Sequence, residues 1–411
     1  MNISSFIANR IAFNRQRSFS RFIIRLSIIA TIISVAVMII TLAFANGFQQ
    51  KVSEKVFSFW GHIRLQEIQP YQSVITEELP ITANDTLITT IKNIPEVETI
   101  HPFATRYAIL KTKDDLEGVL VKGLDSSYHF NHIKDFIIEG HPPVFNDSSY
   151  SRQIMISKHT ADQMKLKTGD RVLIYFIRPD GSQRPDRLTI TGIFKTGIEE
   201  YDKTFAIGDI KLIRRLNDWL PNQVGGYEIF LKDYKKIDSI SNLILNLPEM
   251  PLSWSAQGIQ KITPNIFDWL NMQDVTRNVL IAIMVVVAVI NLITCLIILV
   301  LERMRMIGIL KAIGASDWAV QRIFLQYSLI ITLSGIVAGV ILALGILNLQ
   351  VKTGFIKLQE DAYYLDKVAV KISAPEVLAI CTGTFLVCML VLMIPTYIVR
   401  KVQPVKAIHF R

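Results

Sequence analysis

The distribution of long apolar segments constrains this chain more than any other feature. One such segment runs from Leu26 to Ala45, and mostly polar sequence follows it as far as residue 278. Three more lie in the last third, at Val279–Leu301, Ile323–Leu347 and Val377–Val399. About 20 helical residues cross the hydrocarbon core of a bilayer, so each segment is long enough to span it. Because backbone amides in hydrocarbon must be paired within their own segment, we expect four transmembrane helices.

The positions of basic residues orient these helices. Cytoplasmic flanks of membrane spans retain positive charge. The residues before the first span, the loop between the second and third spans, and the C-terminal tail hold 13 of the 44 basic residues but only two of the 35 acidic ones. We therefore expect both termini in the cytoplasm and a large domain on the opposite side. The excess of basic residues behind the pI near 9.3 is explained by this topology and by the attraction of basic side chains to anionic lipid headgroups. The pI therefore does not indicate nucleic-acid binding.

The predicted fold class is an α-helical integral membrane protein with four transmembrane helices, one before and three after a large α+β periplasmic domain. In chain order the expected segments are a basic cytoplasmic segment (1–25), the first span (26–48), the periplasmic domain (49–276), the second span (277–301), a cytoplasmic loop (302–322), the third span (323–347), a short periplasmic loop (348–376), the fourth span (377–399) and a cytoplasmic tail (400–411).

The expected periplasmic domain alternates short strands with short helices. Residues 62–68, 86–94, 107–112 and 118–122 read as a β-α-β-β unit, and residues 226–270 contain a similar strand, helix and strand. We expect 49–130 and 226–270 to fold together as one subdomain. Residues 131–225 are then an inserted β-rich subdomain, with a hairpin whose loop includes the Pro-Asp-Gly turn at Pro179.

Motifs of catalysis are missing from the sequence. It contains no phosphate-binding loop, no Gly-x-Ser-x-Gly elbow and no His-Glu-x-x-His pair. His129 and His132 have the spacing of a metal pair, but without an obvious third ligand we interpret them as surface histidines and expect no metal site. The cores of the four spans contain no ionisable residue, which disfavours an ion pump. Any energy must come from a partner.

The cytoplasmic loop at 302–322 is where such a partner would act. Ile307, Leu310 and Ile313 recur at helical spacing, Gly314 can end the helix, and Ser316 or Asp317 can start the next one. Such a short amphipathic helix is either a surface connector or a docking element, and its own sequence leaves both open.

Four stretches together resemble the FtsX-like/MacB-type ABC permease family, and within it the transmembrane subunits of the lipoprotein-releasing (Lol) system. They are the first span with its exit at Asn46-Gly47-Phe48, the segments Val121–Asp125 and Ile156–Asp170, the loop Glu302–Ala315, and the end Gln403–Ile408. The resemblance implies a dimer with a second permease copy or a paralogue, bound to two copies of a separate ATPase that holds ATP and Mg²⁺. This chain would need no cofactor and would not itself be an enzyme. The implied ATPase-coupling residues are Glu302, Arg305, Gly308, Lys311 and Gly314.

For a Lol-type permease of the bacterial inner membrane, the resemblance implies extraction of lipoproteins by mechanotransmission and their release to a periplasmic carrier. The candidate lipid cradle on the first helix is Met38, Leu42, Phe44 and Phe48, although the same residues would also suit lipid contact or helix packing. In the third span, Gly335, Gly339 and Ala343 recur every fourth residue, and we assign them to close helix packing.

The family's carrier-docking hook is long, whereas the corresponding loop here is short. Its candidate docking residues are Arg178, Pro179, Asp180, Gly181 and Pro185. This departure leaves carrier docking, and the choice between homodimer and heterodimer, open. Two other functions also remain: an exporter of peptides or small amphiphiles that works with a periplasmic adaptor, and an FtsX-like signalling anchor that regulates cell-wall hydrolases.

Overall fold

The computed structural model describes residues 19–69, 73–145, 149–177 and 183–400. The chain divides into two compact units. The helical unit comprises the residues up to Gln49 together with Asn271–Lys357 and Lys367–Arg411, and the sheet unit comprises Gln50–Leu270 and Leu358–Asp366. We describe each unit by itself.

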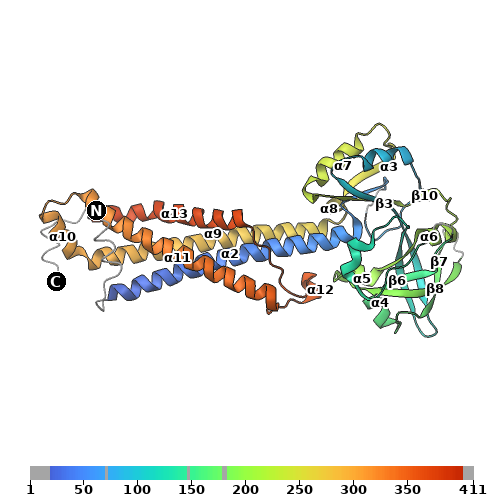
Figure 1. Ribbon diagram of the computed structural model, residues 1–411, viewed down its shortest axis with the longest axis horizontal. Helices are drawn as coiled ribbons and strands as arrows, with labels where there is room; N and C mark the ends of the chain where they lie inside the picture. Colours follow the sequence, from blue (N-terminus) through green and yellow to red (C-terminus); the bar gives the residue numbers. More distant parts are fainter. Residues whose placement is uncertain (1–18, 70–72, 146–148, 178–182, 401–411) are drawn as a thin grey trace. The chain divides into compact units, whose positions relative to one another are not determined.

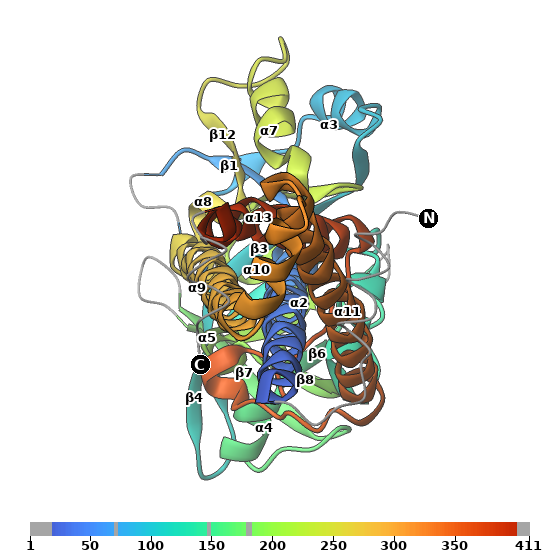
Figure 2. The ribbon, with the colours of Figure 1, turned by 90° about the vertical axis from the view of Figure 1, so that its left-hand side faces the viewer.

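Four long helices supply the helical unit, namely α2 (Phe19–Trp60), α9 (Pro264–Glu302), α11 (Asp317–Thr353) and α13 (Ala374–Arg400). The end of α2 from Gln50 and the start of α9 up to Leu270 belong to the sheet unit. Each is long and apolar enough to cross a membrane. All four predicted spans lie within these helices, and the short helix α10 (Met304–Ala312) joins α9 to α11. Figure 2 shows the bundle end on, with its helices side by side.

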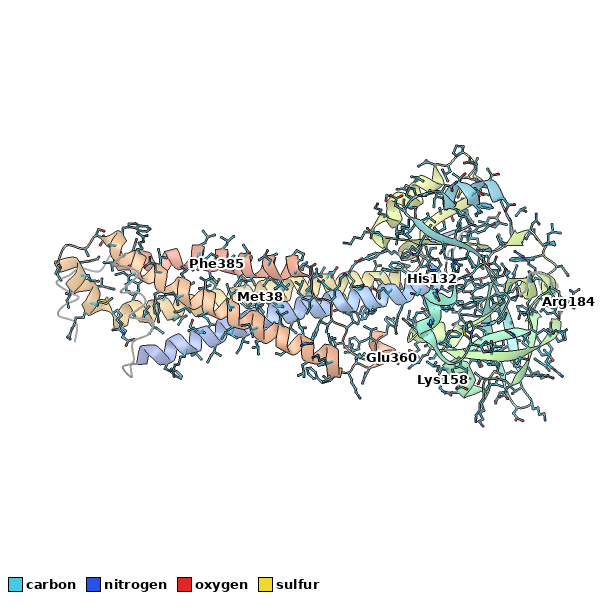
Figure 3. All side chains as sticks on the ribbon, viewed as in Figure 1. Met38, His132, Lys158, Arg184, Glu360 and Phe385 are labelled. Atoms are coloured by element: carbon cyan, nitrogen blue, oxygen red, sulfur yellow. The ribbon has the colours of Figure 1, made fainter. Side chains whose placement is uncertain are left out.

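Two apolar clusters hold this bundle together. One joins α9, α10, α11 and α13, and it includes Leu296, Ile307, Phe324 and Cys388. The other packs α2 on α11 and includes Met38, with Phe385 of α13 partly buried against it. Met38 and Phe385 are both labelled in the bundle in Figure 3.

The sheet unit is built on one ten-stranded mixed sheet. Nine strands follow the order β12-β1-β11-β3-β4-β9-β6-β8-β5, and the tenth, β7, pairs with β3 and β8. Its strands are β1 (Ile63–Glu67), β3 (Val97–Lys111), β4 (Leu116–Leu124), β5 (Ile137–Gly140), β6 (Gln153–Ser157), β7 (Arg171–Ile177), β8 (Gln183–Phe194), β9 (Phe205–Asp209), β11 (Gly226–Leu231) and β12 (Trp254–Gly258). A separate pair joins β2 (Ile81–Thr82) to β10 (Gln223–Val224).

Six of these strands pair in a closed ring. The pairs are β3 with β4, β4 with β9, β9 with β6, β6 with β8, β8 with β7, and β7 with β3. The ring closes because the 15-residue strand β3 pairs with β11 along its first part and with β7 at Ala108–Lys111. The strands β5 to β9 of residues 131–225 therefore share β3 and β4 with the first part of the domain, in one continuous sheet.

The sheet unit also contains short helices. They are α3 (Asp85–Lys92), α4 (Lys158–Gln163), α5 (Glu199–Thr204), α6 (Ile210–Leu216), α7 (Ile237–Leu245), α8 (Ile259–Ile262), α12 (Glu360–Tyr363) and two 3-10 turns at Phe130–Phe136 and Tyr234–Lys236. In Figure 1, α3 and α7 lie together at one end of the sheet unit, and α4 and α5 lie near the ring strands. The predicted helix at 86–94 corresponds to α3, and the helix predicted within residues 226–270 corresponds to α7, whereas the sequence did not predict α5, α6 and β9.

Candidate functional site

The segment between α9 and α11 is shaped by local sequence. Gly314 adopts a left-handed φ of +96° after α10, its N–H donates to Lys311 O at 3.0 Å, and the N–H of Ala315 donates to Leu310 O at 2.9 Å. These two bonds make a Schellman motif, which stops a helix and satisfies its last carbonyls. Ser316 then caps α11 by accepting a hydrogen bond from Ala319 N at 3.2 Å. The predicted helix end and the predicted helix start are both confirmed.

α10 has a buried face and an exposed face. Ile307 and Gly308 are buried, whereas Ile309, Ile313 and the nearby Trp318 are 48%, 80% and 58% exposed. Of the predicted coupling residues, Glu302, Arg305 and Gly314 lie at the surface, and Lys311 forms an ion pair with Asp317 at 2.8 Å. Ile309 and Trp318 are not among the predicted coupling residues, although a tryptophan two residues after a helix cap is an apolar surface signal.

The last residues of α2 insert into the core of the sheet unit, at a place we call the helix socket, formed by Phe59, Trp60, Lys122, Tyr201 and Phe205. The Phe59 ring lies 5.3 Å from Tyr201 and 5.5 Å from Phe205, and the Trp60 ring lies 4.9 Å from Phe205. All five side chains are almost completely buried. The helix therefore ends inside the domain core rather than on its surface.

Lys122 closes the socket electrostatically. Its ammonium donates to the backbone carbonyl of Phe59 at the end of α2 and forms an ion pair with Glu228 at 2.7 Å. A cation at a helix C-terminus satisfies a free carbonyl and the helix dipole. Burial lowers the pKa of Lys122, and the Glu228 carboxylate opposes that shift. Lys122 lies in the Val121–Asp125 stretch that carried part of the resemblance.

Arg64 and Glu78 form a second buried ion pair, and together with Lys122 and Glu228 they make up what we call the buried charged layer. The Arg64 guanidinium donates to the Glu78 carboxylate at 2.6 Å and stacks over the Phe103 ring at 4.4 Å. Arg64 is opposite Glu228 in the β1–β11 register. Two cations and two carboxylates thus neutralise one another inside the sheet unit, as burial of charge requires.

The histidines predicted at the surface divide between two environments. His129 is exposed, but the His132 ring stacks on Phe230 at 3.9 Å, beside His62 and His101. Burial lowers the pKa of His62 to about 4 and that of His101 to about 3. Within residues 19–69, 73–145, 149–177 and 183–400, no cluster of three His, Cys, Asp or Glu side chains is placed to hold a metal ion.

The predicted cradle residues occupy different environments on α2. Met38 is buried in the α2–α11 cluster, whereas Leu42, Phe44 and Phe48 are partly exposed. On the facing helix, Gly339 lies so close to α2 that an added Cβ would be 2.9 Å from Ile32 O and from the Val35 Cβ. Gly335 faces Thr31 in the same way, and Ala343 is fully buried.

The predicted docking loop lies mostly outside the described residues, which is the case for Arg178, Pro179, Asp180 and Gly181. Pro185 is exposed on β8. Its neighbour Arg184 donates to Asp218 and to the carbonyl of Arg215, both at 3.1 Å.

Comparison with known proteins identifies the architecture. Residues 26–244, more than half of the chain, match the MacB-like periplasmic core domain. The chain belongs to this MacB-like family. Residues 278–404 of this MacB-like permease match the FtsX-like permease C-terminal domain, which covers α9 from its first apolar turn through α10 and α11 to α13.

Relatives of this MacB-like permease match it along nearly its whole length. The lipoprotein-releasing system transmembrane protein LolC of Xylella fastidiosa is 24% identical over 96% of both chains. The lipoprotein-releasing system transmembrane protein LolE of Haemophilus influenzae is 23% identical over 99% of both. Among solved structures, the periplasmic region of MacB from Actinobacillus actinomycetemcomitans covers 50% of this chain and 91% of its own, with 9% identity and a TM-score of 0.34, too low to add to the assignment.

These matches confirm the family resemblance on which the sequence interpretation rests. The MacB-like permease is a membrane protein with four apolar helices and a periplasmic-type domain. The helix socket and the buried charged layer fall within the MacB-like part, and α10 falls within the FtsX-like part.

Proposed function

We propose that this chain is the permease subunit of an ABC transporter that extracts lipoproteins from the outer leaflet of the bacterial inner membrane and releases them to a periplasmic carrier. The observation that carries this proposal is the similarity, over 96% or more of both chains, to transmembrane proteins of lipoprotein-releasing systems. The chain would be multi-pass, with cytoplasmic termini and a periplasmic sheet unit, as the basic flanks predict.

A partner ATPase would supply the energy. The exposed apolar side chains of Ile309, Ile313 and Trp318 make α10 a suitable docking element, because apolar anchors at the centre of an interface carry much of its binding energy. Two ATPase copies would bind ATP and Mg²⁺, and a second permease copy or a paralogue would complete the assembly. The chain itself would not hydrolyse ATP.

The structure offers a physical route for mechanotransmission. α2 runs as one helix from Phe19 to Trp60, and its end is fixed in the helix socket by aromatic packing and by Lys122. A displacement of α2 would therefore reach the sheet strands directly.

Transfer of acyl chains from the bilayer into water costs about 0.8 kcal/mol per CH₂, on the order of 30 kcal/mol for two or three chains. The hand-off of a lipoprotein must therefore be shielded from water.

The decisive experiment is depletion of this protein in its own host, followed by fractionation of newly made lipoproteins. Accumulation of lipoproteins in the inner membrane is the expected result. Normal sorting in depleted cells would overturn the proposal and favour the adaptor-linked exporter. Re-expression of the unaltered chain must restore sorting, which excludes an indirect effect of depletion.

A further inference from the structure

The connection between α11 and α13 is longer and more ordered than a simple turn. Connections between packed helices usually have about 2 to 8 residues. Here Gly354 follows α11 and α13 begins only at Ala374, and the intervening chain contains the short helix α12. Its central part, Leu358–Asp366, belongs to the sheet unit, although both flanks belong to the helical unit. We call Leu358–Asp366 the arm.

The base of the arm is fixed to the helical unit. The buried Gln350 side chain of α11 donates to the carbonyls of Ile356 and Val368, both at 3.2 Å, and accepts from Ile356 N at 3.0 Å. Downstream, Lys371 N donates to Ala43 O of α2 at 3.0 Å. The chain on both sides of the arm is therefore held by hydrogen bonds to α11 and α2 and would move with these helices.

The tip of the arm is held by three elements of the sheet unit. The Lys55 ammonium of α2 donates to the carbonyl of Tyr364 at 2.7 Å. Lys195, which follows β8, forms an ion pair with the Glu360 carboxylate. The Tyr364 ring meets the Trp269 ring of α9 edge to face, with 5.5 Å between the centroids. Burial lowers the pKa of Lys55. The Glu360 carboxylate is the nearby charge that most opposes this shift, because it favours the protonated ammonium.

The turn at residues 195–197 leaves space for the Glu360 carboxylate. Asp202 of α5 accepts hydrogen bonds from Thr196 N at 2.8 Å and Gly197 N at 3.0 Å, which fixes the turn after Lys195. Gly197 adopts a φ of +74°, and a Cβ at that position would collide with the Glu360 carboxylate and would lie 2.6 Å from the Lys55 Nζ. The missing side chain leaves room for both charged groups.

Polar contacts hold the tip, together with the aromatic contact of Tyr364 and the buried side chain of Leu365. A cavity of about 450 Å³ adjoins it, lined by Lys55, Lys195, Thr196, Glu360 and Asp366 among others. The Lys195 and Glu360 side chains are 43% and 25% exposed, and pairs of this kind contribute at most about 1 kcal/mol each. Reversal of the Glu360 charge should therefore loosen the tip, because it would place a third cation beside Lys55 and Lys195, without unfolding the sheet unit. Figure 3 labels Glu360 in the arm and Lys158 on α4 near the same turn.

We propose that the arm is a further mechanical link, in addition to the continuous helices α2 and α9, and that Glu360 is its positioning residue, held between Lys55 and Lys195. The cargo named in this proposal depends on the proposed function, whereas the mechanical link does not. Movement of α11 and α13 driven by the partner ATPase would reach the turn at Lys195–Gly197 through the arm. The arm stays attached throughout the cycle and acts as a strut.

The test uses the full-length permease purified with its partner ATPase. The variants are Glu360→Lys, the charge swap Glu360→Lys with Lys195→Glu, and the matched control Glu96→Lys, which reverses an exposed ion pair with Lys236 elsewhere in the sheet unit. Amide hydrogen exchange of residues 196–204 is measured without nucleotide and after trapping with ATP and vanadate. This readout needs no lipoprotein.

We expect nucleotide trapping to change the exchange of residues 196–204 in the unaltered protein and in Glu96→Lys. The change should disappear in Glu360→Lys and return in the charge swap. In parallel, lipoprotein release per ATP hydrolysed should fall in Glu360→Lys and return in the charge swap. An unchanged exchange response in Glu360→Lys would overturn the strut. If the exchange pattern is as expected but the unaltered protein releases no lipoprotein, only the proposed cargo fails.

A reducible cross-link tests whether the arm stays attached. The native cysteines all lie in α9 and α13, outside the sheet unit. Lys195→Cys with Glu360→Cys should be joined by a short bis-methanethiosulfonate cross-linker, which replaces the length of the two side chains through reducible disulfides, and the cross-linked protein should keep the exchange response of the unaltered protein. Loss of that response on cross-linking, with recovery after reduction, would overturn a permanent strut because it would mean that the arm must detach.

Discussion

The ammonium of Lys122 and the carboxylate of Glu228 form an ion pair at 2.7 Å in the core of the sheet unit, with side chains 1% and 0% exposed. The same ammonium bonds the carbonyl of Phe59, so one strand residue joins the end of α2 to β11. Buried pairs of this kind add little net stability, but removal of one partner leaves an uncompensated charge. This contact is therefore a sensitive point for both the fold and the proposed transmission.

Lys122→Met should destabilise the sheet unit by about 3 to 5 kcal/mol, because Glu228 would remain buried without its partner. The double change Lys122→Met with Glu228→Met should recover most of this loss. Denaturant unfolding of the full-length protein in detergent, followed by tryptophan fluorescence, measures both values. Lys134→Met, at an exposed position, is the control and should change stability little. Equal stability of Lys122→Met and Lys134→Met would contradict the buried pairing.

Gly339→Val should disrupt the packing of α2 on α11, since its side chain would collide with the Ile32 carbonyl and with Val35. Overpacking of this kind costs about 1 to 3 kcal/mol. Gly345→Val is the matched control, because it adds the same β-branched side chain to the same helix where no atom lies within 4 Å. Thermal unfolding in detergent should show a lower midpoint for Gly339→Val alone. Equal midpoints for the two variants would mean that α2 and α11 do not pack closely.

Ile313→Asp should weaken binding of the partner ATPase by at least about tenfold, because a hot-spot residue at the centre of an interface contributes about 2 kcal/mol or more. Ile313 is 80% exposed, so the change should leave the permease itself folded. Leu252→Asp, at a side chain 99% exposed in the sheet unit, controls for a new surface charge. Co-purification of the ATPase with each variant gives the comparison. Full recovery of the ATPase with Ile313→Asp would exclude the exposed face of α10 as its docking surface.

Acid should destabilise the sheet unit through His62 and His101. Their pKa values in the folded protein, about 4 and about 3, lie below the ordinary value of 6.5, so the unfolded chain takes up protons first as the pH falls. Stability should therefore be complete above pH 6.5 and should decrease from there toward pH 4, by about 1.4 kcal/mol per pH unit for each histidine that titrates.

His62→Gln tests this pH dependence. The His62 Nδ1 accepts the N–H of Leu231 at 3.0 Å, and a glutamine oxygen retains an acceptor without the titrating proton. Its surroundings include His132, which disfavours the charged form, and Asp233, which favours it. Denaturant midpoints measured at pH 7 and pH 5 should differ less in His62→Gln than in the unaltered protein. The same difference in both would show that His62 does not titrate in this range.

Local sequence predicted much of this protein because some of its structure depends on short-range physics. The four spans follow from segment length and from the need to pair every amide in hydrocarbon. Gly314 and Ser316 set the end of α10 and the start of α11 from within a few residues of each boundary. The four-residue spacing of Gly335 and Gly339 likewise predicted a close helix contact, although it did not identify α2 as the partner.

Other features required the tertiary structure, because they depend on strands and loops that are distant in sequence. The sequence placed residues 131–225 in an insert, but only the pairing of β7 with β3 shows the closed ring. Lys122 is in a strand with no local sign that it would be buried, since its partners lie 63 and 106 residues away. Glu360 and Lys195 are 165 residues apart, and neither reads as more than a surface charge alone.

The sequence by itself determined which segments can lie in a membrane and where local turns stop them, because these depend on composition and on contacts within a few residues. Only the tertiary structure decided which strand completes the ring, which lysine is buried at the end of α2 and where the arm attaches. Such choices arise from many weak long-range contacts that act together.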